Sequence, residues 1–537
     1  MSALLSADDL NDFITPGVAC IKPVTNNSQP PTSTLNEHGE VEIQIDENGN
    51  PLEISKIDGK QTTLSPAQIS LADCLACSGC ITSAEEVLVA QHSHQELLKA
   101  LSNRQEDMIF VASISHQSRA SLATAYNLSI ESVDRLLINL FINKLGFKYI
   151  VGTSLGRKLS LIQEASQLIS QKEQGTLQTP VLSSICPGWV LYAEKTHPYI
   201  LPRMSTTKSP QQITGYLLKT LVAAEEGGIG RNKIYHLSIM PCFDKKLESA
   251  RPEIYGDPTP DVDCVLTAKE LVTLFAEQDI DFLDDQVQKE SIEDIDELYR
   301  RYAPSNWPYV EYSWSNDPGS SSGGYAFHYL KIYQYHLINT QPNVYHDDKF
   351  EIKLINGKNS DIYELRLYYD SKQIASSAVV NGFRNIQNLV RKLKPVESNG
   401  KSSTTTTRAN PLAARRRARM ANKTSASSGD IEIADASKCD YVEIMACPNG
   451  CINGGGQIMP PDKTQEKEWL NEVMAKYNSI SMFDLPSEHR DDMEMLVKWS
   501  NEVLDCGEDG HDRVYKTYFN EVEKPTDPNA VLLGAKW

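Results

Sequence analysis

The 537-residue sequence lacks the motifs that mark several large classes of enzyme. It has no P-loop, because the nearest candidate, Gly152-Thr-Ser-Leu-Gly156-Arg-Lys, has the wrong spacing. No G-x-G-x-x-G opens a βα unit, and neither H-E-x-x-H nor H-x-x-E-H occurs. The sequence therefore excludes the common nucleotide-binding loops and the common zinc-protease sites.

Positive charge and long apolar runs are also scarce. The chain has 52 Lys and Arg against 71 Asp and Glu, and its formal net charge is −19. Such a chain repels phosphate and anionic lipid, so we expect no general binding to nucleic acid. No apolar run approaches the length that spans a bilayer, so we expect no membrane span. The first residues carry Asp8, Asp9 and Asp12 but no early Lys or Arg. They argue against a secretory signal or mitochondrial presequence and favour a cytoplasmic location.

Cysteine is too sparse and too clustered for a disulfide scaffold. The 11 cysteines include one group at Cys74, Cys77 and Cys80 and another at Cys447 and Cys451. Secreted disulfide scaffolds are usually small and dense in cysteine, and this chain is neither. Tight thiol clusters in such a chain predict metal ligands in a reducing compartment. Cys264, Cys439 and Cys506 stand alone, and we interpret them as structural or surface thiols.

Two polar stretches interrupt the chain. The polar composition of residues 24–65 predicts an insert or long loop. Residues 398–430 are basic and rich in Ser and Thr, which predicts a disordered insert. The basic run could instead be a nuclear targeting signal. The predicted organisation is an N-terminal cluster-binding segment over 1–100, a first α/β lobe over 101–230, a second α/β lobe over 231–397, the basic insert over 398–430, and a C-terminal part with a cluster motif, helices and an exposed tail over 431–537.

Strand and helix patterns alternate along the ordered part. Runs of strand length occur at 108–115, 147–153 and 181–185, and helical spacing occurs at 130–146 and 155–172. This βαβαβ order predicts a parallel sheet. Further strands are predicted at 233–240, 262–266, 350–355, 362–369, 374–380 and 441–446, with helices from 269 and over 383–393.

Three cysteines come directly after predicted strands. Cys186, Cys242 and Cys447 each follow a buried strand. Because ligands of parallel α/β sheets collect beyond the carboxyl ends of the strands, we expect these thiols to converge in a cleft between two lobes. With Cys451 they supply four thiolates, enough for one cubane iron–sulfur cluster. A buried core thiol is the alternative for each cysteine taken alone.

The N-terminal cysteines have the spacing of a second cluster. Cys74, Cys77 and Cys80 form C-x2-C-x2-C, which holds three corners of a cubane cluster in bacterial ferredoxins. Structural zinc prefers two separated pairs, so we favour a cluster over zinc or free thiols. We predict Cys20 as the fourth ligand, because the cost of closing a long loop grows slowly with its length.

Three segments together resemble the signature motifs of iron-only hydrogenases. They are Ser184-Ile-Cys186-Pro-Gly-Trp189, Met240-Pro-Cys242-Phe-Asp-Lys245-Lys246-Leu-Glu248 and Met445-Ala-Cys447-Pro-Asn-Gly-Cys451-Ile-Asn-Gly-Gly-Gly456-Gln457. Lys208-Ser209-Pro210-Gln211-Gln212 resembles the segment between the first two motifs. Within this family, the chain is most similar to the hydrogenase-like cytosolic iron–sulfur assembly factors of fungi. Those proteins carry one N-terminal cluster with a distant first cysteine and a C-terminal Trp, and Cys20, Cys74, Cys77, Cys80 and Trp537 stand at matching places.

The resemblance implies an α/β, iron-only hydrogenase-like fold with two parallel-sheet lobes around a cluster-binding cleft. It implies two [4Fe-4S] clusters, one held by Cys20, Cys74, Cys77 and Cys80 and the other by Cys186, Cys242, Cys447 and Cys451. Its implied function is cluster assembly, linking an early cytosolic scaffold to a late targeting complex for cytosolic and nuclear iron–sulfur proteins.

Two further expectations follow from the resemblance. Ile185 stands where hydrogenases have a proton-relaying cysteine, which implies no catalysis and no di-iron subsite. A redox or hydrogen-handling enzyme is the alternative function. Trp537 is expected to dock on the targeting complex from an exposed tail, with core packing as its alternative.

Overall fold

The computed structural model describes residues 89, 91–283, 294–395, 432–503 and 507–521, together with three short strands nearer the N-terminus. Cys20, Cys74, Cys77, Cys80, Cys506, Trp537 and the predicted basic insert at 398–430 lie outside the described residues.

The three short strands lie inside the stretch that the sequence predicts as an insert or loop. β1 (Val41–Ile45), β2 (Pro51–Ser55) and β3 (Gln61–Thr63) pair in order as an antiparallel sheet. The prediction from composition missed them, because it weighed the polar residues of the stretch and overlooked the alternation in Val-Glu-Ile-Gln-Ile.

A four-stranded parallel sheet forms one lobe, with the order β5-β4-β7-β8. Apolar side chains bury its strands among α4 (His116–Ala125), α5 (Ile130–Ile138) and α10 (Ala268–Glu277). Burial on both faces explains why these strands appear as continuous apolar runs in the sequence. The strands are β4 (Ile109–Ile114), β5 (Tyr149–Gly152), β7 (Ile234–Met240) and β8 (Cys264–Thr267).

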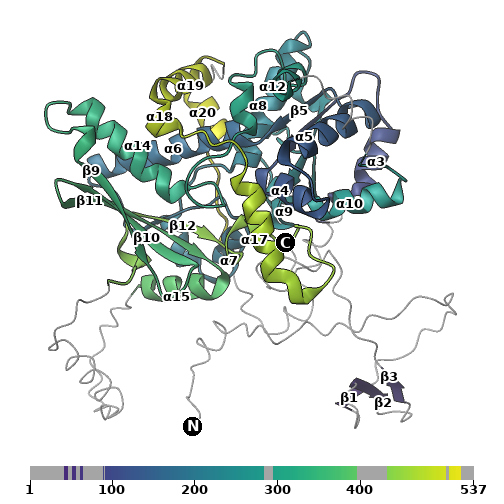
Figure 1. Cartoon of the computed structure of the whole chain (residues 1–537), viewed down its shortest axis with the longest axis horizontal. Helices are drawn as coiled ribbons and strands as arrows, with labels where there is room; N and C mark the ends of the chain where they lie inside the picture. Colours follow the sequence, from purple (N-terminus) through teal and green to yellow (C-terminus); the bar gives the residue numbers. More distant parts are fainter. Residues whose placement is uncertain are drawn as a thin grey trace.

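A five-stranded mixed sheet forms the other lobe, with the order β6-β12-β11-β10-β9. Its strands are β6 (Val181–Leu182), β9 (Phe350–Asn356), β10 (Ile362–Tyr369), β11 (Lys372–Asn381) and β12 (Tyr441–Met445). Strands β9, β10 and β11 pair antiparallel, whereas β11, β12 and β6 pair parallel. Figure 1 shows this sheet between α14 (Tyr325–Thr340) and α15 (Phe383–Leu393).

The α/β fold is confirmed, but the strand partners differ from the prediction in two ways. β6 pairs with β12 rather than with β4 and β5, so the predicted βαβαβ unit is wrong at its third strand. β7 pairs with β4 and β8 pairs with β7, so the parallel sheet takes strands from both of the ranges 101–230 and 231–397. Local patterns indicate that a strand forms, but they carry no information about a partner distant in the sequence.

The second sheet is also mixed rather than parallel, because its connections are short. Only two residues separate β10 from β11, and five separate β9 from β10. Connections of this length close hairpins, whereas a parallel pair needs a crossover of a dozen or more residues. At the first of these turns Asp370 and Ser371 both adopt positive φ, as a tight hairpin requires.

The two lobes share one hydrophobic core. The same buried cluster holds Val111 and Val151 of the parallel sheet and Val380 and Val442 of the mixed sheet. The long helix α6 (Ser154–Glu173) contributes many of its residues to this core. No helix within the described ranges is both long enough and apolar enough to span a bilayer. The shared core fixes the strand ends of one sheet relative to those of the other.

Candidate metal centre

The four cysteines predicted for the second cluster lie at the carboxyl ends of parallel strands. Cys186 follows β6 and is the N-cap of α7 (Pro187–Thr196), and Cys242 lies between β7 and α9 (Asp244–Ser249). Cys447 follows β12, and Cys451 begins the short helix η7 (Cys451–Asn453). Two sheets therefore contribute to one site, β6 and β12 from the mixed sheet and β7 from the parallel sheet.

The loop that carries Cys186 packs directly against the other two motifs. The amide of Ala446, which precedes Cys447, donates a hydrogen bond to Cys186 Sγ at 3.3 Å. A Cβ atom on Gly188 would lie 2.8 Å from Asp244 Oδ2 and 3.4 Å from the Ala446 Cβ. A side chain at residue 188 would therefore push the three motifs apart.

The glycine-rich stretch after Cys451 lies on the backbone of the second motif. The Gly456 amide donates to the Pro241 carbonyl oxygen at 2.9 Å. A Cβ atom on Gly454 would lie 2.3 Å from the same oxygen. Such close backbone contact is possible only without a side chain, and it holds the Cys451 loop beside Cys242.

The four thiols influence one another electrostatically. Burial is the main cause that raises the pKa of each of them, to about 12 for Cys186. Beyond burial, negative charge on the other three thiols further raises the pKa of Cys242, and charge on Cys186 and Cys451 further raises that of Cys447. Cys451 acts in the same way on Cys186. Every pair of the four is thus close enough to interact.

Four thiols are the ligand set of a cubane cluster, which binds each of its thiolates to a different iron. Among the residues that the structure describes, no group of three His, Cys, Asp or Glu side chains is placed to hold a single metal ion. Buried neutral thiols must lose their protons to bind metal, so loading of this site would release protons.

A polar network joins the second motif to the segment at Lys208–Gln212 and to Ile185. Lys245 Nζ donates to the Ile185 carbonyl oxygen at 3.1 Å and to Glu248 Oε1 at 2.8 Å. Glu248 Oε2 accepts from Ser209 Oγ at 2.7 Å and from Gln211 Nε2 at 3.1 Å. The Ile185 side chain is buried and apolar, so it offers no titratable proton at this position.

A serine-rich loop that the sequence analysis missed also contacts the site. Ser322, just before α14, accepts a hydrogen bond from the Cys451 amide through its Oγ at 2.9 Å. Its neighbour Ser321 donates from Oγ to the Asn449 carbonyl oxygen at 3.1 Å. The run Gly-Ser-Ser-Ser-Gly-Gly over residues 319–324 marks a tight turn in the sequence, but nothing in it indicates the partner 129 residues away.

The other two cysteines of the described ranges lie away from these four. Cys264 lies within β8, and Cys439 precedes β12; both are fully buried. Burial raises the pKa of Cys264 to about 12 and also raises that of Cys439, and none of the four site thiols is among the causes of either shift. Both positions suit structural thiols, as the sequence predicts.

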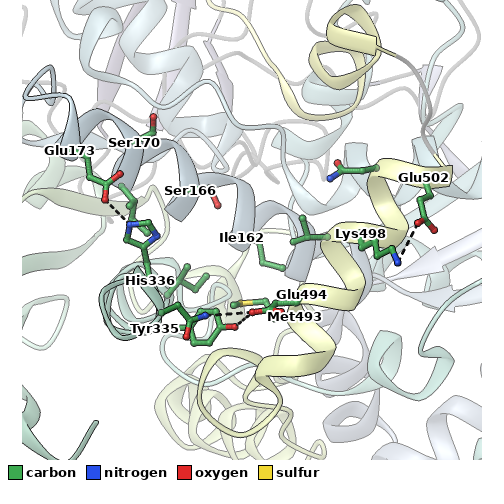
Figure 2. Close-up of a pocket in the computed structure, with 15 residues that line it drawn as sticks. Ile162, Ser166, Ser170, Glu173, Tyr335, His336, Met493, Glu494, Lys498 and Glu502 are labelled. Atoms are coloured by element: carbon green, nitrogen blue, oxygen red, sulfur yellow. Dashed lines mark hydrogen bonds and ion pairs between the residues drawn. The ribbon is translucent and has the colours of Figure 1, made fainter. Parts of the chain in front are cut away.

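A groove of about 940 Å³ lies between α6, α14 and α19 (Arg490–Val503). Figure 2 shows Ile162 and Met493 among its apolar lining, and Glu173 paired with His336 at 2.7 Å on its rim. None of its lining residues is a cysteine, so it is not part of the candidate metal centre.

Comparisons with known proteins show which family the chain resembles. Residues 108–455 match the family described as iron only hydrogenase large subunit, C-terminal domain. Proteins named cytosolic Fe-S cluster assembly factor NAR1 are 64% identical in Scheffersomyces stipitis, over 100% of both chains, and 39% identical in Saccharomyces cerevisiae, over 89% of this chain and 90% of that one.

Solved structures that resemble the chain include hydrogenases. A variant of apo [FeFe]-hydrogenase HydA1 from Chlamydomonas reinhardtii superposes with a TM-score of 0.53 at 20% identity, covering 80% of this chain and 99% of that chain. At this identity the likeness shows the fold alone, and it agrees with the two-sheet architecture described above.

Proposed function

The chain belongs to the hydrogenase-like family of cytosolic iron–sulfur cluster assembly factors, and we propose that it holds two [4Fe-4S] clusters. It passes clusters from an early cytosolic scaffold toward a late targeting complex that matures cytosolic and nuclear iron–sulfur proteins. The name of its relatives places the assembly function in the cytosol. Nuclear residence of the chain itself stays part of the proposal.

The observation that carries this proposal is the meeting of four thiols from two sheets. Cys186, Cys242, Cys447 and Cys451 would hold one cluster, and the glycines at 188 and 454 let the three motifs that carry these thiols pack closely against one another. A cluster bound there supplies a redox-active iron–sulfur group. The protein contributes four thiols, close backbone packing and the Ala446 amide directed at the Cys186 sulfur.

The second part of the proposal rests on the sequence. Cys20, Cys74, Cys77 and Cys80 would hold the other cluster in the N-terminal segment, since their spacing suits three corners of a cubane. These residues lie outside the described part of the chain. Their separation in sequence from Cys186, Cys242, Cys447 and Cys451 supports two independent sites.

We expect no hydrogen evolution when metal-replete protein is supplied with reduced methyl viologen. Ile185 cannot relay a proton, and the family to which the chain belongs is named for assembly rather than catalysis. Headspace gas chromatography measures the product, with the Cys242→Ala variant as the background. Ile185→Cys should stay inactive, because a di-iron subsite would also be needed. Turnover by the unmodified chain above that background would support the enzyme alternative.

We expect deletion of Trp537 to weaken binding to the targeting complex by about 1–3 kcal/mol, the range of an aromatic anchor at an interface. A terminal indole beside a free carboxylate offers a large apolar ring and a charge to one pocket. Isothermal titration calorimetry gives the affinity, and Lys536→Ala is the matched control, which should bind nearly as the unmodified chain does. Iron content and melting temperature should not change. A deletion that lowers stability but leaves affinity alone would assign Trp537 to the core.

A further inference from the structure

The last described segment of the chain lies against the first two cysteine motifs. Residues 516–520, which we call the strap, follow α20 (Gly507–Tyr515). Lys516 forms an antiparallel bridge with Thr207, and the Thr517 amide donates to the Thr206 carbonyl oxygen at 2.7 Å. Main-chain contacts therefore attach the strap to the segment that precedes Lys208–Gln212.

The strap extends the edge of the mixed sheet next to Cys186. β6 is an outermost strand of that sheet. Met204 forms a parallel bridge with Leu182 of β6, and the Ser205 amide donates to the Leu182 carbonyl oxygen at 2.8 Å. Residues 204–207 and then the strap thus follow one another outward from β6. A segment added to a sheet edge is held largely by main-chain hydrogen bonds, and its departure leaves the inner strands paired.

Polar side chains near the first two motifs also hold the strap. Arg251 Nη1 donates to the Tyr518 carbonyl oxygen at 2.9 Å, and the Asn520 amide donates to Glu194 Oε1 at 2.8 Å. Arg251 and Glu194 form an ion pair with each other. Glu194 lies on α7, the helix that Cys186 caps. The position of the strap is therefore tied to the helix that begins at a predicted ligand.

Two small cavities lie between the strap and the motifs, with volumes of about 30 and 50 Å³. Thr517 of the strap and Glu248 of the second motif line both of them. The smaller one is also lined by Ser184 and by Pro187, which directly follows Cys186. Either cavity is large enough for water. The strap thus forms one wall of cavities that reach the backbone beside a predicted ligand.

Burial decreases along this part of the chain. Residues 513–515 are buried, residues 516–519 are half-buried, and Asn520 and Glu521 are exposed. Within the strap, Phe519 packs against the shared core. Segments with few buried side chains open at a lower free energy than the core and independently of it. The strap can therefore leave its place while α20 stays docked.

We propose that the strap is a releasable cover, whose opening gives chelators and cluster acceptors access to the cluster held between the two sheets. This inference rests on the proposed function, because it assumes that Cys186, Cys242, Cys447 and Cys451 hold a cluster. With the strap in place, the cavities beside the first two motifs are closed on that side. Its release opens them to solvent without separating the two sheets.

The test compares full-length variants in a Cys77→Ala background, so that the N-terminal site contributes no iron. Thr517→Pro and Asn520→Pro each remove one amide donor that holds the strap. Both should lose iron to bathophenanthroline disulfonate about 2-fold to 10-fold faster than the background, the factor that corresponds to one hydrogen bond. Thr517→Ala and Asn520→Ala keep the amides and should match the background. Melting temperatures should not change.

Background rates of iron loss in folded Thr517→Pro and Asn520→Pro proteins would overturn the inference. Alanine variants that lose iron as fast as the proline variants would also overturn it, since the amide bonds would then not matter. If Thr517→Pro lowers the melting temperature, Asn520→Pro decides alone by the same criteria, because its site is exposed. A Cys77→Ala background without iron that Cys447→Ala removes is a separate result, in which the proposed function itself fails.

Discussion

Replacing Cys447 by alanine should remove about half of the bound iron and markedly lower the melting temperature of the protein. The thiol lies where the two sheets meet, and a group bound there ties β12 and β6 of one sheet to β7 of the other. A ligand present at a thousand times its dissociation constant stabilises the folded state by about 4 kcal/mol. We expect a loss of at least that size, measured by differential scanning calorimetry beside an iron assay.

Cys439→Ala is the matched control for this experiment. Cys439 is fully buried only a few residues before Cys447, and its thiol donates a hydrogen bond to the Asp435 carbonyl oxygen at 3.8 Å. Its loss should cost about 1 kcal/mol, the usual effect of a point mutation, and leave the iron content unchanged. A Cys447→Ala protein with the iron content and melting temperature of Cys439→Ala would show that the four thiols hold no cluster.

Replacing Cys77 by alanine should also remove about half of the iron but leave the melting temperature almost unchanged. The N-terminal cysteines stand beside the polar stretch at 24–65, and so we expect their cluster to be the more exposed of the two. In the unmodified protein this cluster should be the first to be lost in air or to a chelator. Absorbance at visible wavelengths during exposure to air follows that loss.

Ser78→Ala is the control, because it changes a residue next to Cys77 without removing a thiol. It should keep the full iron content. The assignment of roles to the two sites would be wrong if Cys77→Ala lowered the melting temperature while Cys447→Ala did not. It would also be wrong if the iron that remains in the Cys77→Ala protein were chelated more easily than the iron that remains in the Cys447→Ala protein.

Much of the fold could be predicted from local sequence patterns. The helix over 383–393 and the strand over 362–369 occupy the residues that the patterns predict. The position of Cys186, Cys242 and Cys447 after strands was also predictable, since each ends an apolar run. The rule that ligands gather at the carboxyl ends of parallel strands then brings the thiols together without any knowledge of which strands pair.

The pairing itself could not be predicted from those patterns. β6 has only two residues and pairs with β12, more than 250 residues later in the chain. Its choice of β12 over β4 depends on packing in the completed core. The predicted helix over 130–146 likewise changes character, because α5 passes into a π-helix over Asn139–Lys144 before Gly146 ends it at φ 71°. The change from α-helical to π-helical backbone hydrogen bonds cannot be recognised from the spacing of the apolar side chains.

The residues around the candidate site also divide into those that the sequence predicts and those that it does not. The cysteines and glycines of the three motifs carry chemistry that is visible in the sequence. Ser322 and Gln117 carry no such signal, because serine is common in loops and glutamine is common in helices. Their contacts depend on where α14 and α4 lie in the folded protein. Residues that position a ligand from a distant part of the chain become visible only in three dimensions.

Iron and sulfide analysis of anaerobically purified protein, combined with electron paramagnetic resonance of the reduced sample, tests the central claim most directly. Two cubane clusters predict about eight irons and eight sulfides per chain. The spectrum should contain two signals, of which Cys447→Ala removes one and Cys77→Ala the other. A chain that carries zinc in place of iron, or whose iron is unaffected by Cys447→Ala, would contradict the claim that the four thiols between the two sheets hold a cluster.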